Sequence, residues 1–230
     1  MSVPNLTAAS ESFALETFAE AGRPSTRPAS RGVPAYAAAK RALDLAVALP
    51  ALVLVAPLLV PLAAAIRLES KGPALFRQTR LGQGGVPFTI LKLRTMTVEE
   101  NGPVIRQATA NDARITRVGR FLRAFSLDEL PQFLNVVKGE MSLVGPRPHA
   151  EAHDVYYGGL IGRYTLRQTV KPGITGWAQI HGHRGETPTL GDMRARVDLD
   201  AWYIAHASLA LDLLILLRTP YEVLRRRNAH

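Results

Sequence analysis

The sequence predicts a mainly α-helical protein with a small β-hairpin, attached to one side of a membrane. Residues 45–66 contain no charged side chain but include three prolines. Residues 74–81 and 86–93 are short strand-like runs on either side of a glycine-rich turn, and residues 115–125 have the apolar spacing of an amphipathic helix. We therefore expect a monotopic membrane protein with a re-entrant, proline-broken N-terminal helix and interfacial amphipathic helices.

Length and composition limit the classes of function. At 230 residues the chain is long enough for one domain with a substantial core. The formal net charge of +9 and the pI of about 10.3 indicate an acidic partner, which could be nucleic acid, anionic lipid or a phosphorylated substrate. The chain has no cysteine, which excludes disulfides, thiolate metal sites and thiol nucleophiles.

The composition divides the chain into three regions. Residues 1–35 are rich in Ala, Ser, Thr, Pro and Arg and have no long apolar core, so we expect a disordered tail and not a secretory signal. We assign residues 36–70 to the re-entrant membrane helix. Residues 71–230 are expected to form a cytosolic domain, with interfacial helices, that carries the candidate catalytic residues described below.

The apolar segment is long enough to cross a bilayer, because its 22 residues would extend about 33 Å as a straight helix. Lys40 and Arg41 precede it, and Arg67 and Lys71 follow it, so the positive-inside rule favours a cytoplasmic location for both ends. A helical hairpin broken at Pro57 would enter one leaflet and return. One alternative is a helix that simply spans the bilayer. The other is a core helix of a soluble protein, which rarely needs so long a run without polar atoms.

The glycine-rich residues 82–85 are predicted to form the turn of a β-hairpin. They lack the Gly-Lys-Ser/Thr ending of a phosphate loop and do not open a helix. The outgoing strand carries Lys92 and Arg94 at alternate positions, so we expect their side chains to share one face.

Two further segments predict helices near the membrane surface. In residues 115–125 four apolar side chains follow an i, i+3, i+4, i+7 pattern, and three arginines lie off that stripe. Such a helix could lie on anionic headgroups or pack onto the core, and the segment alone does not decide between them. Residues 202–217 are strongly apolar apart from His206 and Asp212, and we expect one helix lying partly in the interface.

The adjacent carboxylates Asp128 and Glu129 are the strongest candidates for chemistry. Ser126 and Glu129 have the spacing of a capping box, in which the acids would only complement a helix dipole. Pro131 instead favours a helix that begins at that residue. The acids would then approach a helix N-terminus, where phosphate is attracted. In that place they could bind a divalent cation or attack phosphorus.

The histidines give little evidence of a metal site. His149 and His153 are four residues apart, and His181 and His183 alternate. Neither pair matches an HExxH arrangement and no third ligand is evident, so we expect solvent-exposed histidines.

Five motifs, read in order, resemble those of the bacterial sugar transferases, which are small monotopic polyprenyl-phosphate phosphoglycosyl transferases. They are KRALDLAVALP, LKLRTM, SLDELPQFLNVVKGEMSLVGPRP, VKPGITGWAQIHG and VDLDAWYI. The resemblance runs from about Lys40 to the C-terminus. Where relatives often carry Ser-Pro at the membrane break, this chain has Ala56-Pro57, so no serine hydroxyl helps to satisfy the bend.

The resemblance implies transfer of a phosphosugar from a UDP-sugar to undecaprenyl phosphate, with release of UMP and a requirement for Mg²⁺. It implies attachment to the bacterial inner membrane, with the catalytic domain on the cytoplasmic face. Such a reaction would initiate the assembly of exopolysaccharide or another glycoconjugate. No nucleic-acid partner is expected, and the sequence implies no particular oligomeric state.

The resemblance also implies roles for individual residues. Asp128 matches the family's nucleophile, which forms a covalent aspartyl-phosphosugar intermediate, and Glu129 matches its partner carboxylate; both are expected to contact the metal ion. The remaining matched site residues, expected to bind phosphate or substrate, are Lys92, Arg123, Arg147 and Asp200. The specific role of Asp200 is not defined by the resemblance.

Residues 183–193, HRGETPTLGDM, resemble the glucose-1-phosphate transferases more than the galactose enzymes. We therefore expect UDP-glucose as donor, with UDP-galactose as the alternative. A different class of function, a non-catalytic basic membrane-surface adaptor or nucleic-acid binder, would suit the net charge. Aromatic residues make up only 7% of the chain, no basic-aromatic stacking platform is evident, and such a role leaves the adjacent carboxylates unexplained.

Overall fold

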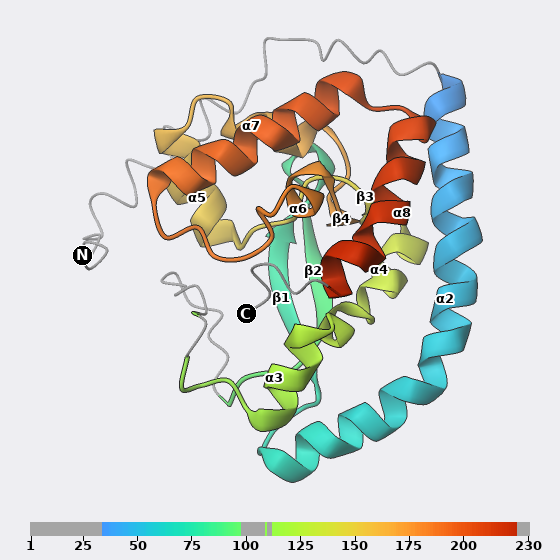
Figure 1. Cartoon of the computed structure of the whole chain (residues 1–230), viewed down its shortest axis with the longest axis vertical. Helices are drawn as coiled ribbons and strands as arrows, with labels where there is room; N and C mark the ends of the chain where they lie inside the picture. The colour runs from blue at the N-terminus through green and yellow to red at the C-terminus, as the bar shows by residue number, and fades with distance from the viewer. Residues whose placement is uncertain (1–33, 98–108, 110–111, 225–230) are drawn as a thin grey trace.

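A computed structural model of the chain describes residues 34–97, 109 and 112–224. The long helix α2 (Pro34–Glu69) borders a globular part built from shorter helices and two small sheets (Figure 1). The later elements are β1 (Leu75–Leu81), η1 (Gln83–Gly85), β2 (Pro87–Leu93), α3 (Arg117–Ala124), η2 (Leu127–Glu129), α4 (Gln132–Lys138), β3 (Ser142–Val144), α5 (Glu151–Leu160), η3 (Tyr164–Thr169), β4 (Gly173–Thr175), α6 (Trp177–Ile180), α7 (Leu190–His206) and α8 (Leu209–Leu224). The predicted disordered tail lies almost wholly outside the described residues.

The predicted β-hairpin is confirmed. Strands β1 and β2 pair antiparallel, with Leu75 opposite Leu93 and Leu81 opposite Pro87. In the turn between them, Gly84 and Gly85 have φ angles of 70° and 72°, a left-handed conformation that glycine adopts without a steric penalty.

A second sheet, which the sequence did not predict, joins the two glycine- and proline-rich motifs. Strand β3 lies parallel to β4, with Ser142 paired to Gly173 and Val144 to Thr175. The backbones that follow these pairs come very close. A Cβ atom on Gly145 would lie 2.4 Å from the carbonyl oxygen of Lys171, so only glycine fits there. The contact fixes where the Gly145–Pro148 turn leaves the sheet.

Helix α2 is continuous through all three of its prolines, so the predicted interruption of the helix at Pro57 is wrong. The axis of α2 instead changes direction in its second half (Figure 1). A proline removes one backbone hydrogen bond and bends a helix, but the turns on either side keep their own bonds and the helix continues.

Most of the apolar surface of α2 is exposed. Its most apolar 18-residue window is only 6% buried, and it is the one helix in the described part of the chain that is long and apolar enough to cross a membrane. Val53 and Leu54 are 75% and 76% exposed. A core helix of a soluble protein would bury these side chains, so that alternative is contradicted and α2 is compatible with monotopic membrane association.

The first turns of α2 are fastened to the globular part by a buried polar network. Asp212 of α8 is fully buried, and its carboxylate lies 2.8 Å from the ammonium of Lys40 and accepts a hydrogen bond of 2.7 Å from the Tyr203 hydroxyl. One turn further along α2, Asp44 accepts bonds of 2.9 Å from the Ser142 hydroxyl and the Leu143 amide.

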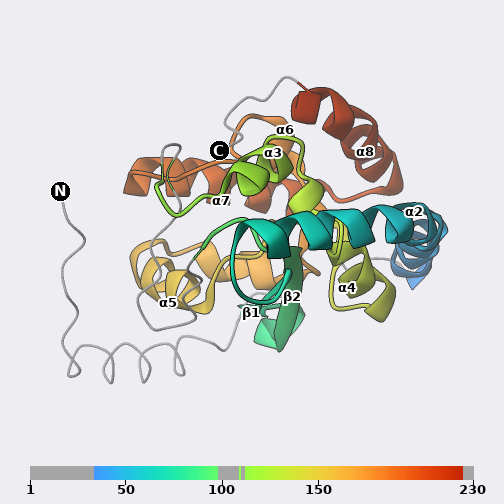
Figure 2. The ribbon, with the colours of Figure 1, turned by 90° about the horizontal axis from the view of Figure 1, so that it is seen from below.

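The far end of α2 docks on the same globular part. Glu69 accepts hydrogen bonds of 2.7 and 2.9 Å from the amides of Arg117 and Val118, the first residues of α3, where a carboxylate complements the helix dipole. Ile66 packs with Leu122 of α3. Both ends of α2 are therefore held by one body, while the middle of the helix is exposed. Figure 2 shows α8 and α4 on opposite sides of α2.

The largest core cluster joins α2 to most of the other elements. Its buried members are Ala48, Phe88, Ile90, Val136, Met141, Leu143, Val144, Ile180, Tyr203, Ile204 and Ile215. Leu122 of α3 is fully buried, which confirms core packing for that helix, although Phe121 on the same stripe is half exposed.

The single helix predicted over residues 202–217 is wrong, because the chain forms two helices there. Helix α7 ends at His206, Ala207 takes an extended conformation, and the Ser208 hydroxyl accepts a hydrogen bond from the Leu211 amide at the start of α8. The break lets α8 bury Asp212 and leaves Leu217 and Leu224 exposed on its other face. This exposed apolar face is compatible with an interfacial location of α8, which stays a prediction.

We expect Asp212→Ala to lower the free energy of unfolding by about 3 kcal/mol, because it removes the buried partner of Lys40 and Tyr203. Chemical unfolding of the full chain in detergent measures the change. Asp198→Ala is the matched control, because Asp198 is an exposed aspartate on α7 and its loss should change stability by less than about 0.5 kcal/mol. Equal effects of the two substitutions would contradict the anchoring role of Asp212.

Candidate active site

The carboxylates Asp128 and Glu129 lie in the short helix η2, between α3 and α4. Helix α4 begins at Gln132, directly after Pro131, so the predicted approach to a helix start is confirmed. The capping-box alternative is wrong, because the Ser126 side chain makes no capping bond. Ser126 instead has a φ of 58°, a left-handed conformation that is uncommon outside glycine and that turns the chain from α3 into η2.

Glu129 is buried and is held by two cations from separate elements. The guanidinium of Arg147 binds it through both nitrogens, with Nη1 donating to Oε2 at 3.1 Å and Nη2 donating to Oε1. Lys92, near the end of β2, donates from Nζ to Oε1 at 2.9 Å. The structure thus brings together three of the predicted site residues. A paired, bidentate arrangement of this kind holds a carboxylate in one orientation.

Arg94 was expected to share a face with Lys92, but its side chain is used elsewhere. It donates to the backbone carbonyl oxygens of Ser70 and Lys71, just after the end of α2. These carbonyls follow a helix C-terminus, where cations are favoured. Arg94 therefore supports the junction between α2 and β1 and is not part of the candidate site.

The two neighbouring carboxylates have opposite electrostatic environments. Burial raises the pKa of Asp128, and the charge of Glu129 raises it further. Burial would also raise the pKa of Glu129, but Arg147 and Lys92 outweigh it and hold that pKa well below its ordinary value. Glu129 is therefore a fixed anion. The Asp128 side chain makes no hydrogen bond or ion pair within the described parts of the chain, so its buried carboxylate oxygens are not committed to a protein partner.

The pair can also serve as ligands for a magnesium ion. Mg²⁺ is usually bound by one or two carboxylates together with substrate phosphates and water. The open oxygens of Asp128 fit this requirement, whereas those of Glu129 already accept bonds from cations. These two carboxylates could therefore hold Mg²⁺ together with substrate phosphates, and Asp128 is the one whose oxygens have no protein partner among the described residues.

Two further arginines surround the carboxylates. Arg123, predicted from the resemblance, donates to the Thr95 hydroxyl at 3.4 Å, and its charge lowers the pKa of Asp128 against the effect of burial. Arg184 was not predicted. Its Nη2 donates to the Ser126 hydroxyl, and its Nη1 is buried without a partner within the described residues. The only sequence signal for Arg184 was its place in the HRGET segment used to assign the sugar.

Four cations therefore act on two carboxylates at this site, namely Lys92, Arg123, Arg147 and Arg184. The surplus positive charge would favour an anionic ligand such as a diphosphate. This arrangement gives a chemical reason for the acidic partner that the net charge of the chain predicted.

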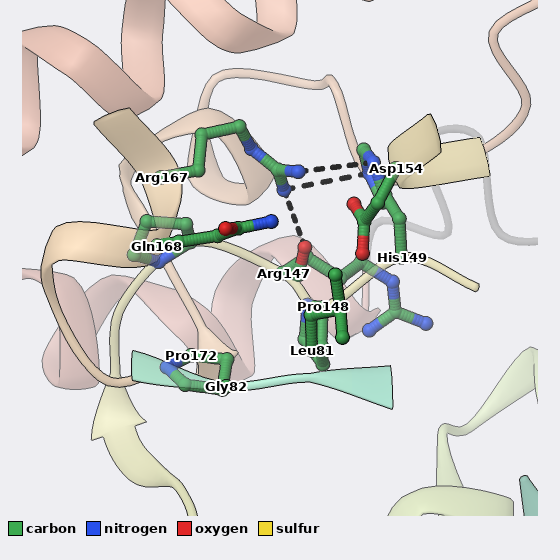
Figure 3. A pocket seen from close by; sticks show the side chains of 10 residues that line it. Leu81, Gly82, Arg147, Pro148, His149, Asp154, Arg167, Gln168 and Pro172 are labelled. Carbon is green, nitrogen blue, oxygen red and sulfur yellow. Dashed lines mark hydrogen bonds between the residues drawn. The ribbon is translucent and has the colours of Figure 1, made fainter. Parts of the chain in front are cut away.

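Asp200 does not touch the paired carboxylates. It is buried and accepts a hydrogen bond of 2.7 Å from Nε of Arg167. The same guanidinium donates to the backbone carbonyl of Arg147 and to the ring of His149 (Figure 3). The structure thus links Asp200 to the site through Arg167, which holds the backbone that carries Arg147.

His149 corrects the expectation that the histidines are exposed. It is buried, and Arg167 donates to its Nδ1 at 3.0 Å. Burial and the charges of Arg167 and Arg196 hold the pKa of His149 well below its ordinary value, so the ring is neutral. His181, by contrast, is exposed as predicted.

The pocket drawn in Figure 3 lies behind the Gly145–Pro148 turn, between that turn and residues of η3. It has room for about one water molecule. A sugar nucleotide cannot enter so small a space. The pocket walls include Arg167 and Pro172, which contact the backbone of the Gly145–Pro148 turn.

Asp154 lines the same pocket and accepts a hydrogen bond of 2.7 Å from the Tyr164 hydroxyl. We predict that its contribution to stability depends on pH. Burial raises its pKa to about 6, so the folded state holds the proton more tightly than the unfolded chain does. The resulting stabilisation is fully present below about pH 4 and is lost as the pH rises through about 6. Relative to Asp154→Asn, which does not titrate, the wild type should lose about 2 kcal/mol of unfolding free energy between pH 4 and pH 7. Unfolding in detergent across this range measures it, and parallel profiles would contradict it.

Comparison with known proteins agrees with the motifs. Residues 35–226 match the model of the bacterial sugar transferase family. The chain is 56% identical over 191 residues to a UDP-glucose:undecaprenyl-phosphate glucose-1-phosphate transferase of Caulobacter vibrioides, covering 83% of this chain and 72% of that protein. It is 54% identical over 183 residues to a protein of the same description from Escherichia coli, covering 80% of this chain and 39% of that protein.

A third relative, described as exopolysaccharide production protein PSS of Rhizobium leguminosarum, is 41% identical over 191 residues, which cover 81% of this chain and 96% of that protein. The chain thus spans less than half of the Escherichia coli protein but nearly all of the Rhizobium protein. The family match covers every element described above, including both carboxylates and the cations around them. The chain belongs to the bacterial sugar transferase family.

Proposed function

We propose that this protein transfers glucose 1-phosphate from UDP-glucose to undecaprenyl phosphate and releases UMP. One observation carries the proposal: of two adjacent buried carboxylates, Glu129 is bound on both oxygens by cations while Asp128 is left open. Such a division of roles suits a nucleophile beside a fixed partner. Two relatives described as UDP-glucose:undecaprenyl-phosphate glucose-1-phosphate transferases support the choice of substrates.

The proposed reaction has two displacement steps at the same phosphorus. A carboxylate oxygen of Asp128 attacks the phosphorus that bears glucose, and the bond to the bridging oxygen breaks, so that UMP leaves with the electron pair. A phosphate oxygen of undecaprenyl phosphate then attacks the acyl phosphate. The Asp128 carboxylate leaves, and undecaprenyl diphosphate glucose is formed.

Both steps bring an anion to an anionic centre, so the surrounding charge matters. Arg147 and Lys92 hold Glu129, and with Arg123 and Arg184 they make the site electropositive enough to accept phosphate groups. We assign Mg²⁺ to Asp128 and Glu129, where it would offset the negative charge of the diphosphate. The raised pKa of Asp128 also makes its carboxylate a stronger nucleophile once it is ionised.

We propose glucose as the donor sugar from the sequence and the position of one segment. Residues 183–193 resemble the glucose-type sequence, and Arg184 within that segment reaches Ser126 beside the carboxylates. UDP-galactose remains the alternative within the same reaction. Initial rates of UMP release with a panel of UDP-sugars would decide between them.

We propose that α2 is re-entrant and that the globular part lies on the cytoplasmic face of the inner membrane. A straight helix of 36 residues would extend about 54 Å and place its ends on opposite sides of a bilayer. Here Asp44 and Glu69 both bond to the globular part. Positive charges at both ends of α2 favour the cytoplasmic side.

We expect Asp128→Asn to reduce UMP release by about a thousandfold or more, because the amide cannot act as the nucleophile. The assay uses the full chain in detergent with Mg²⁺ and UDP-glucose labelled in glucose. Without acceptor, the wild type should release one UMP per active enzyme and retain the label after denaturation. Asp128→Asn should do neither.

Asp198→Asn is the control, since this aspartate is exposed on α7 and is not among the residues that contact the paired carboxylates, so the variant should retain full activity. If the wild type released UMP only when undecaprenyl phosphate is present and carried no label, the covalent route would be replaced by direct transfer. No UMP release from any UDP-sugar with acceptor present would remove the proposed function itself.

The topology is tested with single cysteines, because the chain has none of its own. We expect Ala38→Cys and Lys71→Cys, at exposed positions before and after the apolar segment, to resist a membrane-impermeant thiol reagent outside spheroplasts. Both should react after lysis, as should the control Asp198→Cys. Labelling of Ala38→Cys alone from outside would show a spanning helix and refute the re-entrant arrangement.

A further inference from the structure

A buried asparagine connects the strand that carries Lys92 to the helix that follows the carboxylates. Asn135 lies on α4, six residues after Glu129, and is 0% exposed. Its Oδ1 accepts a hydrogen bond of 3.1 Å from the Leu91 amide. Its Nδ2 donates to the Thr89 carbonyl at 2.7 Å and to Oε2 of Glu140 at 2.6 Å. All the hydrogen-bonding groups of this side chain are therefore used.

The bonds to Thr89 and Leu91 have the pattern of a neighbouring strand. In an extended strand, the amide and carbonyl groups of residues two apart point to the same edge. Strand β2 has β1 on one side only. The carboxamide of Asn135 bonds to one amide and one carbonyl of β2 as a paired strand would. Helix α4 is thereby attached to β2 in a single register.

This attachment lies next to the catalytic cations and carboxylates. Lys92 directly follows Leu91 and reaches Glu129 at 2.9 Å. Glu129 lies just before α4, whose position Asn135 fixes against β2. A shift of α4 along β2 would separate the ammonium from the carboxylate, and an error of about 1 Å in a catalytic arrangement can cost about a hundredfold in rate.

We infer that Asn135 is a positioning residue that sets the distance between Lys92 and the paired carboxylates. The inference rests on the proposed function for its effect on rate, but its effect on geometry can be measured separately. Asn135 has no hydrogen bond to Asp128, Glu129 or Lys92, so it acts on them only through β2 and α4. A role limited to stability is the competing explanation, and the test has to separate the two.

The first measurement is the chemical reactivity of Lys92. Asn135→Asp keeps the shape of the side chain but removes both N–H donors. It should free Lys92 from Glu129, and acetylation of Lys92 by an amine-reactive ester, read by peptide mass spectrometry in the full-length protein, should become at least about threefold faster. Thr219→Val is the control, because it removes hydrogen bonds of a half-buried side chain elsewhere in the chain, namely those of the Thr219 hydroxyl to the Thr175 hydroxyl and the Ile215 carbonyl. It should leave Lys92 reactivity unchanged.

The second measurement is kinetic. We measure the rate of the first UMP release without acceptor as a function of UDP-glucose concentration. Asn135→Asp should lower the rate at saturation about 10- to 100-fold, with little change in the half-saturating concentration. In the Lys92→Gln background the same substitution should cost less than about threefold, because no cation remains to be positioned. A purely structural role predicts equal losses in both backgrounds.

A companion variant keeps the test valid if Asn135→Asp does not fold. Adding Glu140→Gln removes the repulsion between the two acids and should restore folding, while Thr89 still lacks its donor. Unchanged Lys92 reactivity in the folded variants would overturn the inference, whatever the rates. If Asn135→Asp raises Lys92 reactivity but the wild type releases no UMP, the positioning role stands and the proposed function is rejected.

Discussion

The buried carboxylate of Glu129 is the point on which the arrangement of the site depends. Taking a charge out of water is costly unless it is paired and hydrogen-bonded. Arg147 and Lys92 provide that pairing, and they arrive from the turn after β3 and from the end of β2. Three segments that are distant in the sequence must therefore meet in one geometry for the site to be stable.

Each of these segments has its own support. Asn135 attaches α4 to β2, and the Asp200–Arg167 pair holds the backbone at Arg147. The close approach of Gly145 to the backbone at Lys171 fixes the start of the turn. These supports use buried charges and buried amides that bond to one another, so other arrangements would leave some of them without a partner. They hold Glu129 and its two cations in place without a ligand, which favours electrostatic stabilisation of a charged transition state.

The same globular part also holds the apolar helix α2 at both ends. Polar contacts at Asp212 and Asp44 hold the start of α2, and Glu69 holds its end against α3. The apolar middle of α2 stays exposed and would be stabilised in a non-aqueous environment. If α2 lies in a membrane as proposed, these contacts would keep the candidate site at a constant distance from it, as the proposed transfer to a lipid-linked phosphate requires.

The sequence by itself determined the helical class, the hairpin and the apolar helix, and it singled out Asp128 and Glu129 as candidates, because these depend on local periodicity, turn chemistry and short motifs. It did not determine that α2 continues through Pro57, since neighbouring helical turns can tolerate a lost bond. Nor did it reveal the break at Ala207, the β3–β4 pairing or the burial of His149. The place of Arg184 and the link from Asp200 to Arg167 were also decided only in the tertiary structure. Each of these features depends on which distant group lies nearby, and that is set by the satisfaction of buried charges and polar groups across the whole core.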